Sequence, residues 1–366
     1  MITQLELRNF QVFRDLSISF SPGINVIIGE NGTGKTQLLK AAYALLYGDN
    51  MFDPFSRPAD DVDNFRNSPR EKHLFTERLL KIFMPLNGQL GEMCHSRTVS
   101  KAEIGISLDD MKLLSRSSKV SFQRDSEVVD IGSSYDYGRS SIAPVFIPTK
   151  EVLSWMEGFS SLYSKYRLSF DQTYQDICIL LDLPELNLNQ VQPESQRAIE
   201  TIEKICGGRF VFHGGGKVTF RTREFEYSAN AVAEGLRKVG MLSRLLLTGS
   251  VQPGHSGTLF WDEPEANLNP KLMRILVEIL VDLSRKGQQI ILATHEYVLL
   301  KWFDLLVDRE KGDRIAFHTL YKNQDTNEIE VKTVDNYLAV IPNAITETYK
   351  DITKEQVRQT LGNLGK

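Results

Sequence analysis

The sequence has 366 residues, 41% of them apolar and 25% charged, a composition that predicts a globular protein with one large α/β domain or two smaller ones. Its formal net charge of −4 excludes a global basic field for nucleic acid, and its three widely spaced cysteines exclude a disulfide framework and a CxxC metal site. It has no signal-peptide pattern and no apolar run of about 20 residues, so we expect a cytoplasmic protein that does not enter a membrane.

The first candidate site is a phosphate-binding loop. Residues 24–28 (INVII) form an apolar, β-branched run typical of a buried strand, and a helical pattern begins after GENGTGKT, which meets the pattern GxxxxGK[ST]. Its glycines let backbone N–H groups curl around phosphate, Lys35 reaches the β- and γ-phosphates, and the Thr36 hydroxyl holds Mg²⁺. The residues predicted to bind ATP here are Asn31, Gly32, Thr33, Gly34, Lys35, Thr36 and Gln37.

Three segments are predicted after this loop. Residues 51–102 begin as a polar loop and continue as a helix. Residues 103–131 alternate like the strands of an antiparallel β-lobe, which with a further strand extends to residue 150, and residues 151–207 read as a helical lobe. Basic and aromatic residues mix in the first segment, as in proteins that bind DNA, but acidic residues dilute their charge. This dilution favours a partner-binding or solvated face, and DNA remains the alternative.

A pair of carboxylates ends the next predicted strand, residues 258–261. Asp262 is predicted to hold Mg²⁺, and Glu263 to polarise the water that attacks the γ-phosphate. An amphipathic helix at 271–285 and a buried strand at 289–295 complete the unit. The polar groups therefore gather at the C-terminal ends of parallel strands, where α/β sheets bind ligands.

Together these motifs resemble the ABC-type ATPases of the SMC, RecF and OLD group. LELRNFQVFRDLSISFSPG, which begins at Leu5, is similar to the N-terminal strands of the group. DEPEANLNP, which begins at Asp262, resembles its Walker B motif and D-loop, and ATHE, which contains His295, resembles its switch-histidine segment. The resemblance implies an α/β fold. This fold is an ABC-type ATPase head with a mixed, largely parallel P-loop sheet, an N-terminal antiparallel β-lobe and a helical insertion lobe.

The resemblance also implies a domain organisation. Residues 1–50 and 208–305 form the ATPase core, joined by the β-lobe and strand of 103–150. Residues 51–102 and 151–207 are insertions, and residues 306–366 form a C-terminal hairpin followed by a polar helix from Lys354.

A site shared between two copies follows from the same resemblance. The signature motif of the group caps the γ-phosphate held by the partner subunit, and here VAEGL matches it. Glu234 and Gly235 then open a helix at the phosphate, while Ala233 stands where the group has serine. An ordinary amphipathic helix is the alternative interpretation.

The resemblance assigns the remaining catalytic role to His295, one strand beyond the carboxylates, as the sensor of the γ-phosphate, and a hydrogen-bonded core histidine is the alternative. The glutamine of the Q-loop has no counterpart after the strand near residues 143–148, where Lys150 and Glu151 are the polar candidates.

The predicted function is that of an ATPase subunit. We expect it to dimerise around ATP and Mg²⁺ and to regulate a separately encoded effector, a nuclease or toxin, in bacterial antiphage defence. The tail after His295 contains no DxD motif for paired metals, so we expect no nuclease activity in this chain. The alternatives are a RecF-like DNA-repair ATPase that binds DNA in an ATP-dependent manner, and the nucleotide-binding subunit of a transporter.

Overall fold

The computed structural model describes residues 1–49, 69–96, 98–99, 101–110, 113–132, 143–187, 189–341 and 344–362. The loop predicted at the start of the 51–102 insertion falls at residues 50–68, outside the described residues. No helix of the described ranges is both long and apolar enough to cross a membrane.

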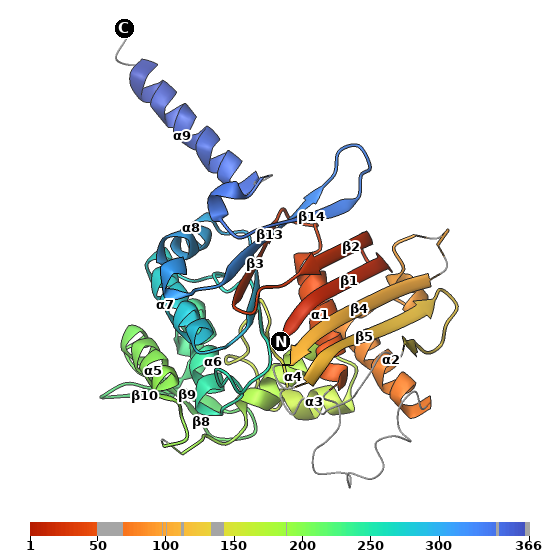
Figure 1. Cartoon of the computed structure of the whole chain (residues 1–366). Coiled ribbons are helices and arrows are strands. Elements are labelled where there is room, and N and C mark those ends of the chain that lie inside the picture. Colours follow the sequence, from red (N-terminus) through yellow and green to blue (C-terminus); the bar gives the residue numbers. More distant parts are fainter. Residues whose placement is uncertain are drawn as a thin grey trace.

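Groups of strands and groups of helices follow one another along the chain, and single strands and helices alternate between residues 226 and 322 (Figure 1). The strands are β1 (Ile2–Phe10), β2 (Phe13–Ser19), β3 (Ile24–Gly29), β4 (Lys101–Asp110), β5 (Leu113–Gln123), β6 (Asp130–Gly132), β7 (Val145–Ile147), β8 (Arg209–Phe212), β9 (Val218–Arg221), β10 (Glu226–Ser228), β11 (Leu259–Asp262), β12 (Ile290–Thr294), β13 (Ile315–Lys322) and β14 (Ile329–Val334). The helices are α1 (Lys35–Asp49), α2 (Pro69–Phe83), α3 (Phe159–Lys165), α4 (Gln172–Leu181), α5 (Pro193–Cys206), α6 (Glu234–Leu247), α7 (Pro270–Arg285), α8 (Tyr297–Leu306) and α9 (Ala344–Gly362).

The central sheet has the order β14-β13-β3-β12-β11-β7 and is parallel except for the edge strand β14. All six residues of β3 are buried, as expected of a parallel strand covered on both faces. β7, β11, β12 and β3 run in one direction, so the segments that follow their C-terminal ends meet along one edge of this sheet. The fold class predicted from the sequence is confirmed.

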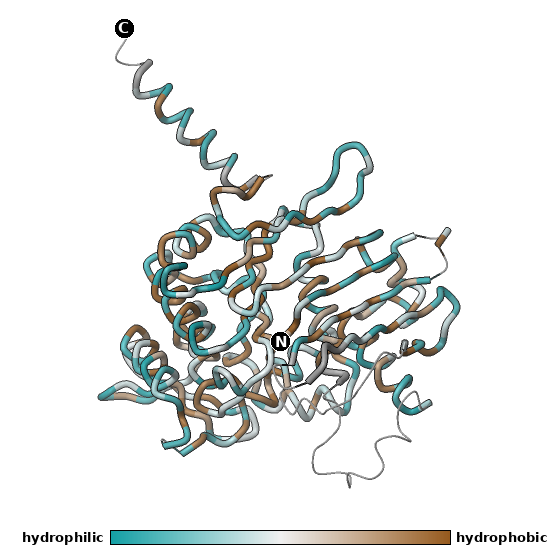
Figure 2. Tube along the Cα trace, in the orientation of Figure 1, coloured by the Kyte–Doolittle hydropathy of each residue, from teal (hydrophilic) through white to brown (hydrophobic). Residues whose placement is uncertain are grey.

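The second sheet is antiparallel, with the order β2-β1-β4-β5-β6, and α1 packs between the two sheets. Neighbouring residues of β3 face opposite sides: Ile27 belongs to the core with α1 and the antiparallel sheet, whereas Val26 belongs to the core under α6, α7 and α8. Figure 2 shows hydrophobic residues along the central strands and hydrophilic ones in the loop of the β13–β14 hairpin. The buried residues of the helix after the phosphate loop belong to the core that this helix shares with the antiparallel sheet.

Two segments make pairings that were not predicted from the sequence. Strands β8–β10, within the range predicted for the core, form a three-stranded sheet of their own. Strand β13 forms the predicted hairpin with β14 and also pairs in parallel with β3, because its first six residues are buried and require neighbours on both sides. The domain boundaries themselves stay a prediction.

Helix α9 begins at Ala344, ten residues before the predicted start, and projects away from the body (Figure 1). Near its base, the Tyr349 ring stacks on Tyr297 of α8 with 4.2 Å between the ring centroids.

Ion pairs and a hydrogen bond connect α1, α2 and α4. Asp176 of α4 is 3% exposed and accepts from Arg78 of α2 and, at 2.8 Å, from the Tyr43 hydroxyl of α1. Lys40 of α1 pairs with Asp171 at 2.8 Å. The basic residue Arg78 of the first insertion is thus buried in a contact within the chain, so its charge is not offered to DNA at the surface.

A buried histidine gives the central sheet a pH-dependent stability. His318 of β13 lies 3.1 Å (Nε2) from Asn25 Oδ1 and 2.8 Å (Nδ1) from Thr333 Oγ1, and burial lowers its pKa from 6.5 to about 3. Below pH 6.5 the unfolded chain binds a proton here that the folded chain binds only near pH 3. We therefore expect His318 alone to lower the free energy of unfolding by about 1.4 kcal/mol for each unit by which the pH falls from 6.5 towards 3.

Urea unfolding of the wild type and of His318→Gln at pH 7, 6 and 5 gives the free energy of unfolding of each protein as a function of pH. The difference between the two slopes is the contribution of His318. The glutamine amide can donate and accept but does not titrate, so the variant loses the His318 contribution. Equal slopes for the two proteins would contradict the assignment.

Candidate active site

The loop between β3 and α1 is built on left-handed glycines. Gly32 and Gly34 have φ of 83° and 89°, which side chains rarely adopt. At Gly34 an added Cβ would lie 2.5 Å from Val12 Cγ2 and 2.6 Å from Phe13, so the loop also packs closely on the turn after β1. The Thr33 hydroxyl donates to the Glu30 carbonyl at 2.8 Å and closes the turn.

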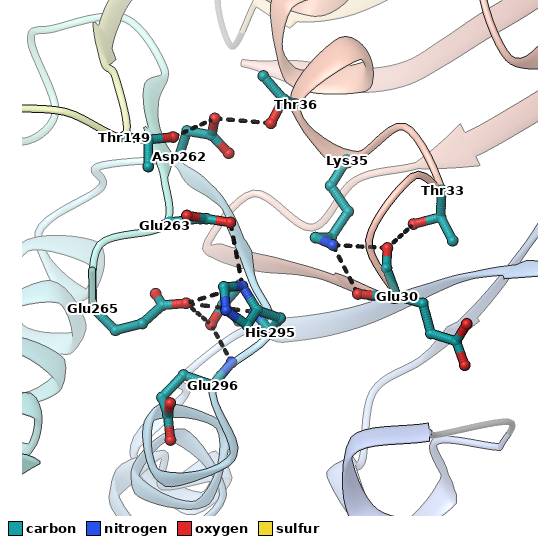
Figure 3. Close-up of polar contacts among 12 residues, drawn as sticks. Glu30, Thr33, Lys35, Thr36, Thr149, Asp262, Glu263, Glu265, His295 and Glu296 are labelled. Atoms are coloured by element: carbon teal, nitrogen blue, oxygen red, sulfur yellow. Dashed lines mark hydrogen bonds and ion pairs between the residues drawn. The ribbon is translucent and has the colours of Figure 1, made fainter. Parts of the chain in front are cut away.

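Lys35 extends from the first residue of α1 back across this loop (Figure 3). Its Nζ donates to the Gly29 carbonyl at 2.7 Å and to the Glu30 carbonyl at 3.0 Å. Burial lowers the pKa of Lys35, and the negative charge of Glu263 is the largest effect opposing it. The ammonium therefore lies between the loop and the carboxylates of the neighbouring strand ends.

Asp262 ends β11 opposite the start of α1. Its Oδ2 accepts from the Thr36 hydroxyl and from the Thr149 hydroxyl, each at 2.8 Å. Burial raises the pKa of Asp262, and these two hydroxyls oppose the rise. Its other oxygen, Oδ1, is buried and has no hydrogen-bond partner within the described part of the chain. A buried carboxylate oxygen and a hydroxyl are hard ligands, so this pair fits Mg²⁺, and the glycine loop with Lys35 fits a polyphosphate.

Glu263 follows with a left-handed backbone, φ 47°, which is strained for a residue with a Cβ. Its Oε1 lies 3.2 Å from His295 Nδ1 (Figure 3). Glu265 flanks the same ring at 3.9 Å and accepts from the Thr294 hydroxyl at 2.7 Å. Burial raises the pKa of Glu265. The strand ends of β11 and β12 thus place a carboxylate and an imidazole together at the edge that also carries Lys35.

The remaining loop residues have separate surroundings. The Gln37 amide donates to Gln11 Oε1 at 3.3 Å, and Asn31 and Gly32 are exposed at the tip of the loop. Among the described residues, no hydrogen bond or ion pair joins Glu234 or Gly235 to the loop or to the carboxylates. Gly235 instead packs on the backbone at Asn267, whose O would lie 2.3 Å from an added Cβ.

Three polar residues of the site were missed in the sequence: Thr149, Lys238 and Glu265. Thr149 lies just beyond strand β7, where the family resemblance implies a glutamine and this chain has a hydroxyl side chain. Glu151, one of the two polar candidates at this place, forms an ion pair with Arg237 at 2.8 Å. Lys238 is 1% exposed on the apolar face of α6, and burial lowers its pKa to about 8. A lysine in an otherwise apolar helical stripe was the available signal.

The glycine loop on α1, the carboxylates after β11 and the histidine after β12 define an ATPase head of the ABC type. The chain belongs to the family described as "AAA domain, putative AbiEii toxin, Type IV TA system", which matches residues 92–301, and a further family, "AAA domain", matches residues 4–138. It is therefore an ATPase of the SMC, RecF and Rad50 type.

Sequence similarity to individual proteins is confined to short segments, whereas similarity of fold extends over most of the chain. The DNA replication and repair protein RecF of Limosilactobacillus reuteri is 47% identical over 45 residues, 12% of this chain and 12% of that protein. The DNA double-strand break repair Rad50 ATPase of Halobacterium salinarum is 45% identical over 51 residues, 14% of this chain and 6% of that protein. A solved SMC head bound to the C-winged helix domain of ScpA shares the fold, with a TM-score of 0.55 at 14% identity, over 91% of this chain and 97% of that one.

Proposed function

We propose that two copies of the chain bind ATP and Mg²⁺ between them and couple hydrolysis to their opening and closing. The observation that carries this proposal is the convergence of Lys35, Thr36, Asp262 and Glu263 on one edge of the parallel sheet, with Thr36 and Asp262 joined at 2.8 Å. Ligands of α/β sheets bind at this edge.

Each residue has a role that its chemistry allows. Lys35 and the loop N–H groups bind the phosphates, and Thr36 and Asp262 hold Mg²⁺, which when bound neutralises charge on the transferring phosphoryl group. Glu263 orients the attacking water and accepts its proton. His295, 3.2 Å from Glu263, donates to the γ-phosphate and fixes the Glu263 carboxylate.

The shared site rests on the start of α6. Ala233 and Glu234 are exposed, and Ala233, at the N-cap position, makes no side-chain hydrogen bond to the N-terminal N–H groups of this helix. Uncapped N–H groups and the helix dipole favour an anion. Glu234 and Gly235 of one copy would thus present this helix end to the γ-phosphate held by the other copy.

We also propose that the dimer regulates a separately encoded effector, a nuclease or toxin, in antiphage defence. The family description, which names a toxin and a toxin–antitoxin system, supports this. A DNA-repair ATPase is the second candidate, supported by the local matches to RecF and Rad50. Co-purification of a nuclease or toxin from the host favours the first candidate, and ATP-dependent DNA retention by the purified chain alone favours the second.

Ala233→Tyr tests the sandwich. Residue 233 is exposed and has an extended backbone, so tyrosine fits the single copy but would separate two copies at this point. With a non-hydrolysable ATP analogue and Mg²⁺, we expect the wild type to double its mass in light scattering, and the variant to stay monomeric while binding nucleotide within about threefold of wild-type affinity.

Ala339→Tyr, at another exposed alanine, is the matched control and should dimerise normally. Dimerisation of Ala233→Tyr at wild-type nucleotide and protein concentrations would refute the shared site.

A further inference from the structure

Lys238 lies one turn into α6 and is buried at the site rather than at its surface. Its Nζ donates to the backbone carbonyl of Thr149 at 2.7 Å and to the backbone carbonyl of Glu263. These carbonyls follow two different strands of the central sheet, β7 and β11. One ammonium therefore joins the start of α6 to both strand ends.

The Thr149 contact leads to the predicted metal ligand. The Thr149 hydroxyl donates to Asp262 Oδ2 at 2.8 Å. Lys238 thus holds the backbone of the residue whose side chain orients Asp262. A displacement of the Lys238 side chain would therefore affect the position of the Asp262 carboxylate through one intervening residue, Thr149.

The Glu263 contact acts on a strained backbone. At φ 47°, Glu263 is held by its own N–H, which donates to the Ala293 carbonyl at 2.9 Å, and at its carbonyl by the Ala266 N–H at 3.1 Å and by Lys238. A left-handed residue with a side chain is strained and persists only where its surroundings enforce it. Lys238 is the one side chain among these three backbone contacts of Glu263.

The start of α6 is tied to the same region by its neighbours. Arg237 pairs with Glu151 at 2.8 Å, two residues beyond Thr149, and Gly235 packs on the backbone of Asn267. The helix start, the segment after β7 and the segment after β11 therefore form one connected unit.

We propose that Lys238 is a positioning residue for ATP hydrolysis, which transmits contact of the α6 N-terminus with a second copy to the orientation of Glu263 and Asp262. This inference rests on the proposed two-copy function. It adds that dimer formation and hydrolysis are separable steps, linked through one side chain that touches neither nucleotide nor metal.

Lys238→Met tests the link, because methionine keeps much of the length and loses the donors. Lys204→Met, at an exposed position of α5, is the matched control. We expect nucleotide affinity, KM and dimerisation in a Glu263→Gln background to stay within about threefold of their references, while kcat per bound nucleotide falls at least about tenfold, since small displacements of catalytic groups cost that much. Lys238→Arg, which keeps donors and charge, should recover most of the rate.

Two results overturn the inference: an unchanged kcat, or a loss of kcat that parallels equal losses in nucleotide binding and dimerisation, which would mark Lys238 as structural support alone. Should Lys238→Met fail to fold, Thr149→Val decides. It removes only the hydroxyl to Asp262, and a wild-type kcat in it would break the path. If the wild type neither dimerises nor hydrolyses ATP, the proposed function itself is refuted. If the wild type does both and Lys238→Met is equally active, only the role of Lys238 is refuted.

Discussion

Lys35→Ala is expected to weaken ATP binding by at least about 100-fold. The buried ammonium contacts the backbone of the glycine loop, and hydrogen bonds to charged groups contribute about 1.5–3 kcal/mol each, so losing two of them to phosphate gives an effect of this size. Equilibrium titration with a fluorescent ATP analogue measures the affinity, and thermal unfolding shows whether the variant is folded.

Lys204→Ala, at the exposed position on α5, is the control for loss of one positive charge. A folded Lys35→Ala protein with wild-type affinity would show that nucleotide binds elsewhere, and the assignment of the loop would have to be given up.

Glu263→Gln is expected to lower kcat by roughly 10²–10⁴-fold, the contribution of a positioned general base, without weakening ATP binding. The amide keeps the size of the carboxylate but cannot accept the proton. ATP therefore stays intact between the two copies, and we expect a stable ATP-bound dimer in light scattering together with the loss of phosphate release.

The matched control is Glu278→Gln on α7, where the carboxylate pairs with Arg274 at the surface. This variant should hydrolyse ATP as the wild type does. If Glu263→Gln stays monomeric with ATP and Mg²⁺, hydrolysis does not depend on assembly and the shared site is wrong.

The phosphate loop and the strand-end carboxylates were predictable because their signals are local. A buried strand, a glycine turn and a helix start lie within one stretch of sequence, and the parallel-strand rule brings the ends of β11 and β12 to it. Glu263 and His295 meet at 3.2 Å for this reason.

The residues that connect these motifs could not be predicted in the same way. The hydrogen bond from Thr149 to Asp262 spans 113 residues, and the one from Lys238 to Thr149 spans 89, so both depend on how strands and helices pack. The sequence predicted the hairpin of β13 with β14 but not the pairing of β13 with β3, in which the buried His318 is hydrogen-bonded to Asn25 and Thr333. The early turns of α9 contain threonine and isoleucine, whose low helix propensity hid its start.

The pairing of β13 with β3 has a consequence for synthesis of the chain on the ribosome. Residues 24–29 pair with residues 315–320, and the Gly29 backbone packs against the Leu320 carbonyl, which would lie 2.6 Å from an added Cβ. Strand β3, which leads into the nucleotide-binding loop, therefore cannot pair with β13 until most of the polypeptide has been translated. Such distant pairing slows folding and leaves the unpaired edge of β3 exposed, so we expect the emerging chain to need protection by chaperones until β13 is added.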